Sequence, residues 1–207
     1  MMKPDSKAAE KSANHSDATK KRKAKVDACI VRADEQRGVS ILLTGNGKGK
    51  SSSAFGMAMR SLGYGFKVGI VQFIKGRQLS GEEIFIREKH PDVYFHQMAT
   101  GFTWNTQDRE ADIAAAEATW AHAEKLLQDD SYHLVILDEL TYMLSYKYLD
   151  EETVLSALRH RPEQQSVVVT GRAGGEALRD LVDTVSEIQD IKHAFKAGVK
   201  ARRGVDF

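Results

Sequence analysis

Cysteine is nearly absent from this chain of 207 residues, since Cys29 is the single one. No intramolecular disulfide and no multi-cysteine zinc site can form, and a reducing, cytoplasmic compartment is the simplest expectation. No apolar run approaches the ~20 residues that a membrane span needs. The first thirty residues also lack the apolar stretch of a signal peptide. We therefore expect neither secretion nor membrane insertion.

An excess of charge is also lacking. The net charge is +1, from 30 basic and 29 acidic side chains, and residues 1–40 carry ten of the basic and six of the acidic ones. The rest of the chain is slightly acidic, which does not favour a broad basic surface for the phosphate backbone of nucleic acid. Nucleic acid is not expected as the main partner.

Two regions are predicted from composition. Residues 1–25 contain Lys, Ala, Ser and Asp with few apolar side chains, which predicts a disordered basic tail. The basic run at 20–25 could contact nucleic acid or an anionic ligand, but a solvated tail is the favoured interpretation. Residues 26–207 have an ordinary globular composition and predict a single domain, with a short helix at about 26–36.

Short apolar runs alternate with helical patterns along the predicted domain. Strands are predicted at 39–43, 67–73, 93–98, 133–138, 166–170 and 184–188, and helices at 50–62, 82–89, 108–127, 151–159 and 176–182. Three of the strand runs are continuously apolar, which favours strands covered on both faces, as in a parallel sheet. The pattern predicts an α/β fold of three layers with a mostly parallel six-stranded sheet.

A glycine-rich segment follows the first predicted strand. It reads Gly45-Asn46-Gly47-Lys48-Gly49-Lys50-Ser51 and leads into the helix at 50–62; we call residues 45–51 the phosphate loop. Its glycines let backbone amides approach an anion, Lys50 adds a positive charge, and the Ser51 hydroxyl can ligate Mg²⁺. Thr44 stands where the common motif has glycine. We predict a bound nucleoside triphosphate and a P-loop NTPase-like (RecA-like) fold.

A second acidic element fits this loop. The apolar run at 134–137 ends in Asp138 and Glu139, and in P-loop proteins such a strand lies beside the first one. Asp138 would then hold Mg²⁺, directly or through water. Glu139 would project toward the reacting groups.

Two large aromatic residues, Phe102 and Trp104, lie in the polar segment after the predicted strand at 93–98. Ligands bind α/β sheets at such strand ends, so the two rings could form a wall for a flat organic substrate. Rings that anchor the loop to the core are an equally open interpretation.

Six motifs together resemble the ATP:corrinoid adenosyltransferases, the P-loop cob(I)alamin adenosyltransferase family. They span residues 38–207 and comprise Thr44–Ser51, Val71-Gln-Phe-Ile-Lys-Gly76, Met98-Ala-Thr-Gly-Phe-Thr-Trp104, Leu137-Asp-Glu-Leu-Thr-Tyr142, Thr170-Gly-Arg172 and Lys192-His-Ala-Phe-Lys-Ala-Gly-Val-Lys-Ala201. The family's loop has the same threonine as Thr44. It commonly has threonines where this chain has Ser51 and Ser52, but serine keeps the metal-binding oxygen.

The resemblance implies transfer of the 5′-deoxyadenosyl group of ATP to the cobalt of a reduced corrinoid, with release of triphosphate, in cobalamin biosynthesis or salvage. It implies catalytic roles for Phe102, Trp104, Glu139 and Lys50. It implies Mg²⁺ held by Ser51 and Asp138. The implied nucleotide-binding residues are Gly45, Asn46, Gly47, Lys48, Gly49, Lys50, Ser51, Ser52 and Arg172.

The resemblance also implies partners and a mobile cover. Phe102 and Trp104 would occupy the lower face of the corrin and expel the axial ligand, so that Co(II) is reduced more easily. The helix at about 26–36 would act as a lid over the corrinoid. An electron-donating reductase such as a flavoprotein and a homodimer are expected.

Two other functions remain open from the residues alone. Another P-loop enzyme, such as an ATPase or a small-molecule kinase, would release ADP. A non-enzymatic nucleotide-dependent regulator would use the basic tail to bind nucleic acid, and its binding would depend strongly on salt.

Overall fold

The computed structural model describes residues 6–74, 79–98 and 108–206, with side chains from residue 19 onward. The chain divides into two units, Met1–Gln36 and Arg37–Phe207. No helix in these described ranges is both long enough and apolar enough to cross a membrane.

The first unit contains one helix, α1, which begins at Ser6 and ends at Arg32. This differs from the sequence expectation of a disordered tail to residue 25 followed by a short helix at about 26–36. The composition argument considered only how little apolar surface the segment can bury. Helix formation is also local, and this segment is rich in Ala and Lys and contains neither glycine nor proline. That residues 1–25 act as a mobile basic tail stays a prediction.

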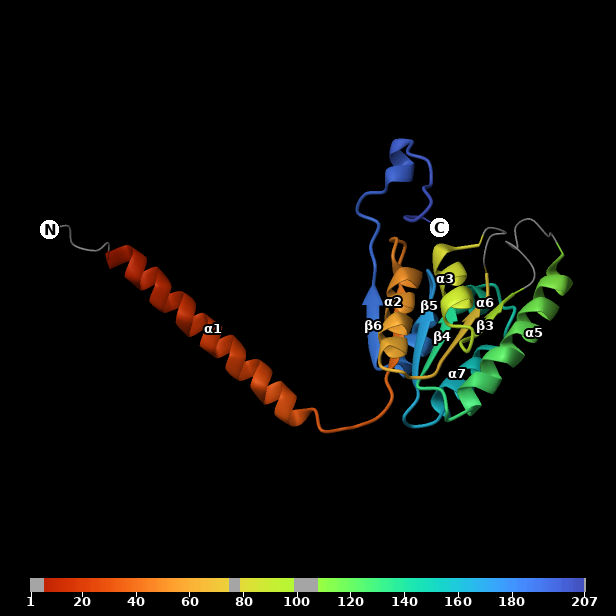
Figure 1. Cartoon of the computed structure of the whole chain (residues 1–207), viewed down its shortest axis with the longest axis horizontal. Helices are drawn as coiled ribbons and strands as arrows, with labels where there is room; N and C mark the ends of the chain where they lie inside the picture. The colour runs from red at the N-terminus through yellow and green to blue at the C-terminus, as the bar shows by residue number, and fades with distance from the viewer. Residues whose placement is uncertain (1–5, 75–78, 99–107, 207) are drawn as a thin grey trace. The chain divides into compact units, whose positions relative to one another are not determined.

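The second unit is built on a sheet of six strands (Figure 1). They are β1 Ser40–Thr44, β2 Val68–Gln72, β3 Tyr94–Gln97, β4 Leu134–Asp138, β5 Ser166–Thr170 and β6 Thr184–Glu187. The spatial order is β3-β2-β4-β5-β1-β6, and each neighbouring pair is parallel. The predicted six-stranded, mostly parallel sheet is confirmed. The expectation that the strand ending in Asp138 lies beside the first strand is wrong, because β5 lies between β4 and β1.

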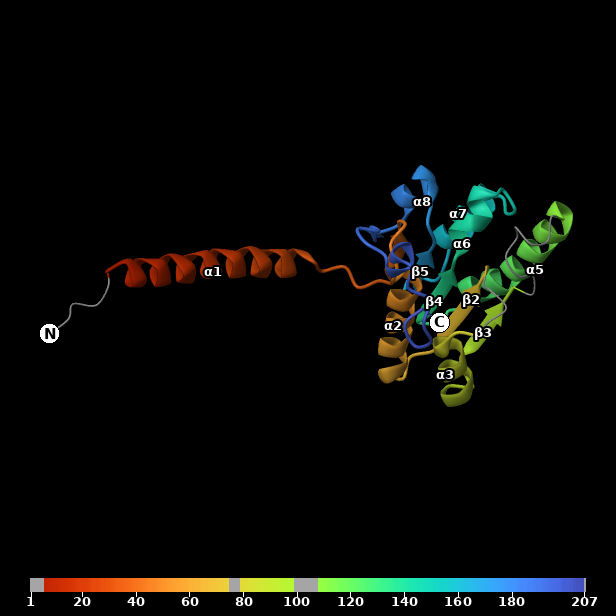
Figure 2. The same cartoon turned by 90° about the horizontal axis from the view of Figure 1, so that it is seen from above.

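Helices cover both faces of this sheet (Figure 2). One face carries α2 Lys50–Gly63 and α3 Gly81–Lys89, whose apolar side chains pack on β1, β2, β4 and β5. The opposite face carries α5 Arg109–Gln128, α6 Leu140–Ser145, α7 Glu151–Arg159 and α8 Gly175–Leu181. A short 3₁₀ helix, η1 Ala194–Ala197, follows β6. The three-layer α/β fold is confirmed.

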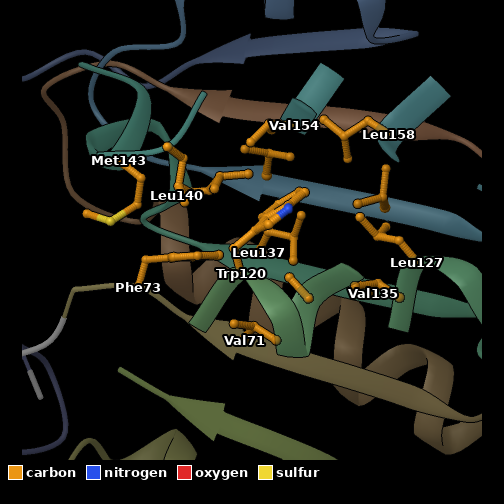
Figure 3. Close-up of a cluster of buried hydrophobic side chains, with 14 of the residues drawn as sticks. Val71, Phe73, Trp120, Leu127, Val135, Leu137, Leu140, Met143, Val154 and Leu158 are labelled. Carbon is orange, nitrogen blue, oxygen red and sulfur yellow. The ribbon is translucent and has the colours of Figure 1, made fainter. Parts of the chain in front are cut away.

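The larger part of the core lies between the sheet and α5, α6 and α7 (Figure 3). Trp120 of α5 packs there with side chains of β2 and β4, including Val71 and Leu137, which are fully buried. Helix α5 presents one apolar stripe to this core: Ala116, Trp120, Ala123 and Leu127 are buried, and Ile113 at the same helical spacing is partly buried. Helices cover both faces of each continuously apolar strand, so the side chains on both faces of that strand are buried.

The carboxylate of Asp183 joins the neighbouring strands β1 and β6 where both strands begin. This is the amino edge of the sheet. Arg37 Nη2 donates to Asp183 Oδ1 over 2.7 Å, and the backbone N of Ser40 donates to Asp183 Oδ2 over 2.8 Å. Ser40 Oγ also donates to Oδ2 over 2.7 Å. The Arg37 hydrogen bond, with those from Ser40, holds the pKa of Asp183 well below its usual range. This contact links the start of β1 to the start of β6.

Candidate functional site

The carboxyl ends of β1, β2, β4 and β5 meet at one edge of the sheet, because all of these strands are parallel. A cleft with a volume of about 1280 Å³ lies at this edge. Its lining comes from the phosphate loop, the start of α3, the segment after β4, the turn after β5 and residues 190–206. Ligands of α/β sheets bind at such an edge.

The phosphate loop begins where β1 ends. Gly45 and Gly49 have φ angles of 96° and 120°, which side chains other than glycine rarely adopt. Gly47 has a different constraint: its backbone N donates to the carbonyl of Ile188 over 2.6 Å, and an added Cβ would lie 2.6 Å from the carbonyl oxygen of Gln189. The loop is therefore held between α2 and the segment that follows β6.

Thr44 is the last residue of β1, and it is fully buried. Its Oγ1 donates to the carbonyl oxygen of Arg172 over 3.1 Å. A glycine at this position would lack that hydrogen bond between the end of β1 and the turn after β5. The departure from the common motif thus has a structural role.

Lys50 is the first residue of α2, and its ammonium group turns back over the loop. Nζ donates to the carbonyl of Gly47 over 2.7 Å, and only 8% of the residue is exposed. The pKa of Lys50 is lowered overall, because the effect of burial is larger than that of the Glu139 carboxylate, which raises the pKa. A cation held in this position is partly desolvated and would interact strongly with a phosphate.

Asp138 ends β4 and lies in a network with the ends of two neighbouring strands. Its Oδ2 accepts from Nε2 of Gln72 in β2 over 2.8 Å, and its Oδ1 accepts from Oγ1 of Thr170 in β5 over 2.7 Å. Thr170 Oγ1 in turn accepts from the backbone N of Glu139 over 2.9 Å. Asp138 is 1% exposed and does not line the cleft.

Glu139 lies directly after this strand, in the left-handed region with φ of 60° and ψ of 21°. Such a conformation costs free energy in a residue other than glycine and often occurs at functional sites. Its side chain lines the cleft together with Arg172 and Tyr142. Burial, and then the Glu139 carboxylate, raise the pKa of Tyr142, so its phenol stays protonated near neutral pH.

The turn after β5 approaches α6 closely. Gly171 has a φ of 147°, and an added Cβ would lie 1.8 Å from Thr141 Oγ1. This position therefore requires glycine, and it fixes the backbone immediately before Arg172.

Residues 190–206 form the remaining wall of the cleft. Asp190 pairs with Lys196 over 2.6 Å, and Asp206 pairs with Lys48 of the phosphate loop over 3.0 Å. Phe195 also lines the cleft, with 73% of the residue exposed. This wall presents charges of both signs and the rings of Phe195 and His193.

Nine of the predicted site residues line this one cleft. They are Asn46, Gly47, Lys48, Gly49, Lys50, Ser51, Ser52, Glu139 and Arg172. Gly45 and Asp138 do not line it and lie behind it in the loop and the strand. Phe102 and Trp104 lie outside the described residues, so their positions stay predictions.

Sequence reasoning missed several lining residues. No site role was predicted for Tyr142 and Tyr146 of the α6 region or for Asp190, Phe195 and Asp206, although all five line the cleft. The motif at 192–201 contains Phe195 and was the available signal for that residue. No local sequence pattern, however, predicts that the mostly irregular segment after β6 lies against the carboxyl edge of the sheet.

Comparisons with known proteins agree on one family. The model of the family described as ATP:corrinoid adenosyltransferase BtuR/CobO/CobP matches residues 36–207. A corrinoid adenosyltransferase of Escherichia coli (strain K12) is 53% identical over 185 residues, which are 89% of this chain and 93% of that protein. A corrinoid adenosyltransferase of Pseudomonas aeruginosa is 51% identical over 198 residues, which are 96% and 98% of the two chains. The corrinoid adenosyltransferase CobA of Salmonella typhimurium is 53% identical over 185 residues.

Proposed function

The chain belongs to the ATP:corrinoid adenosyltransferase family, and we propose that it transfers the 5′-deoxyadenosyl group of ATP to the cobalt of a reduced corrinoid. It is a transferase of cobalamin biosynthesis, and triphosphate is the second product. The observation that carries the proposal is the cleft at the carboxyl edge of the sheet. Its volume of about 1280 Å³ exceeds the ≈ 300–1,000 Å³ of a typical small-molecule pocket, as two large substrates require.

The chemistry of the reaction fits the residues of the cleft. Cobalt attacks C5′ of the ribose, so the whole triphosphate chain is the leaving group and negative charge gathers on its α-phosphate end. Backbone amides of the phosphate loop and the partly desolvated Lys50 would stabilise that charge. Co(I) is a strong nucleophile, so the protein need supply neither a nucleophile nor a general base.

Further contacts are proposed for the polar residues of the cleft. Asn46, Lys48, Ser52 and Arg172 would bind phosphate oxygens, since all four line the cleft beside Lys50. Glu139 would face the ribose or the corrin, because its side chain lies on the same wall as Tyr142. Gly45 would contribute through the backbone of the loop.

Mg²⁺ is proposed as the metal of the nucleotide, and the oxygen donors present are of the kind that it prefers. The Ser51 hydroxyl lines the cleft and would ligate the ion directly. Both oxygens of Asp138 already accept hydrogen bonds, from Gln72 and Thr170, and its side chain is buried. Asp138 therefore fits a role through a metal-bound water. When bound, the ion would withdraw charge from the triphosphate.

Phe102 and Trp104 are proposed to cover the lower face of the corrin. The segment that carries them starts after Met98, whose backbone N donates to the carbonyl of Gln72 over 2.9 Å, and it ends at Asp108, which caps α5. Gln72 is the last residue of β2, so the segment starts at the same edge of the sheet as the cleft. Apolar rings offer no donor atom to cobalt, and a four-coordinate Co(II) is easier to reduce.

Two partners complete the proposal. A substrate that arrives as Co(II) needs one electron before it can attack, so a reductase such as a flavoprotein would supply that electron. We also propose a homodimer, because the family that the sequence resembles forms homodimers.

An anaerobic incubation with Mg-ATP and chemically reduced cobalamin tests the function. We expect a light-sensitive alkylcobalt absorbance and one triphosphate for each adenosylated corrinoid, and neither with the Lys50→Ala protein. Release of ADP with unchanged corrinoid would identify an ATPase or kinase instead.

A further inference from the structure

An acidic side chain lies against the phosphate loop. Asp206 Oδ1 is 3.0 Å from Nζ of Lys48, and both residues line the cleft. The two side chains are 26% and 43% exposed, so the pair is accessible to a ligand that enters the cleft. The mechanism above assigns no role to this carboxylate.

The position of Asp206 is determined by a second contact. Its Oδ2 accepts from the backbone N of Arg202 over 2.7 Å, which closes the turn at 202–206. The Arg202 amide and the Lys48 ammonium both lower the pKa of Asp206, so the carboxylate is ionised at neutral pH. One oxygen thus holds the turn and the other faces the loop lysine.

The two lysines of the loop have different partners. Lys50 donates to a backbone carbonyl within the loop, whereas Lys48 pairs with a carboxylate from a distant segment. A carboxylate and a phosphate offer the same kind of anionic oxygen to an ammonium group. A triphosphate in the loop would therefore need the charge that Asp206 now neutralises.

We propose that Asp206 is a positioning residue that competes with the triphosphate chain for Lys48 and so weakens the binding of both ATP and the triphosphate product. The proposal rests on the proposed function, because it requires that the phosphate loop binds a triphosphate. A highly charged product held by a loop of amides and lysines would leave slowly. Return of Asp206 to Lys48 offsets part of that attraction and favours release.

Asp206→Asn is a suitable test, because the asparagine carbonyl oxygen can still accept from Arg202 N while the charge that pairs with Lys48 is lost. The probe is inorganic tripolyphosphate, titrated into the full chain by calorimetry, and then Mg-ATP. Because an exposed ion pair contributes little, we expect Kd for tripolyphosphate to fall only about two- to fivefold. Asp206→Glu, which keeps the charge, should stay near the wild-type value.

Coupling to Lys48 distinguishes competition from a general loss of negative charge. In the Lys48→Gln background, Asp206→Asn should leave Kd unchanged. Asp190→Asn is the matched control, because Asp190 lies on the same wall but pairs with Lys196. It should have the same effect with and without Lys48. If Lys48→Gln abolishes measurable binding, the decision rests on whether Asp206→Asn tightens binding more than Asp190→Asn does.

Three results would overturn the inference. Unchanged or weaker binding in Asp206→Asn refutes the competition while leaving the proposed function intact, and so does equal tightening in both Lys48 backgrounds. If the wild-type chain binds neither tripolyphosphate nor Mg-ATP, the proposed function fails and the inference fails with it.

Discussion

Replacement of Thr170 by valine should destabilise the protein far more than replacement by serine. The Thr170 hydroxyl is fully buried, donates to Asp138 Oδ1 over 2.7 Å and accepts from the backbone N of Glu139 over 2.9 Å. Valine has nearly the same shape but has no hydroxyl group. The substitution would leave a buried carboxylate oxygen and a backbone amide without these partners.

The size of the effect follows from the two lost contacts. A hydrogen bond to a charged group contributes about 1.5–3 kcal/mol, and an unsatisfied buried group costs about 1–3 kcal/mol. The two losses share one atom and are not additive, so we expect Thr170→Val to lower the free energy of unfolding by about 2–4 kcal/mol. Thr170→Ser keeps the hydroxyl and loses one methyl group, which costs about 1 kcal/mol.

Urea unfolding measures both variants. It is followed by tryptophan fluorescence, to which Trp120 in the core beside the sheet contributes. Equal destabilisation by valine and serine would mean that the methyl group, not the hydroxyl, contributes the stability. A loss below about 1 kcal/mol for Thr170→Val would refute the network itself. A further readout is Mg²⁺: if Asp138 holds the metal through water, Thr170→Val should raise the Mg²⁺ concentration needed for half-maximal ATP binding.

Three further predictions concern the turn, the sheet edge and the segment outside the described residues. Gly171→Ala should prevent stable folding, because the new Cβ would lie 1.8 Å from Thr141 Oγ1. The control is Gly56→Ala in α2, whose new Cβ meets no atom within 4 Å and which should raise the melting temperature. Because the pKa of Asp183 is lower in the folded chain, its contribution to stability is present above pH ~4 and is lost as the pH falls through the folded value. Acid unfolding of Asp183→Asn should therefore show a weaker pH dependence than the wild type below that point, and identical profiles would contradict the contact. Phe102→Ala should slow adenosylation from Co(II) more than from preformed Co(I), and equal losses in both assays would refute the proposed ligand expulsion.

The strands could be predicted because their signal is local. The runs at 134–137 and 167–169 are continuously apolar, and the corresponding β4 and β5 are buried along almost their whole length. Helix α6 was missed because Leu140–Ser145 is too short to display a helical period. The part of helix α1 before residue 26 was missed for another reason, since an argument about burial cannot detect a helix that local propensity favours.

Part of the candidate site could likewise be predicted from the sequence, and part of it could not. The phosphate loop is one continuous segment, so the residues that line the cleft there could be proposed from the sequence. Gln72 and Thr170 were not predicted as partners of Asp138, because they are separated from it by 66 and 32 residues and only the strand order brings them together. The contact of Asp206 with Lys48 depends on where the chain runs after β6, which no residue pattern states.

The glycines of the phosphate loop show why the motif alone is an incomplete description of the site. Gly49 has a positive φ with no atom within 4 Å of an added Cβ, so its requirement is one of backbone angle. Gly47 has no such angle, and its requirement comes from the carbonyls of Ile188 and Gln189, which lie 2.7 and 2.6 Å from an added Cβ. Its backbone amide also donates to Ile188, so one amide of the loop is already engaged by protein. A movement that displaced Ile188, Gln189 and Asp206 together would therefore change both the packing against Gly47 and the pairing of Lys48.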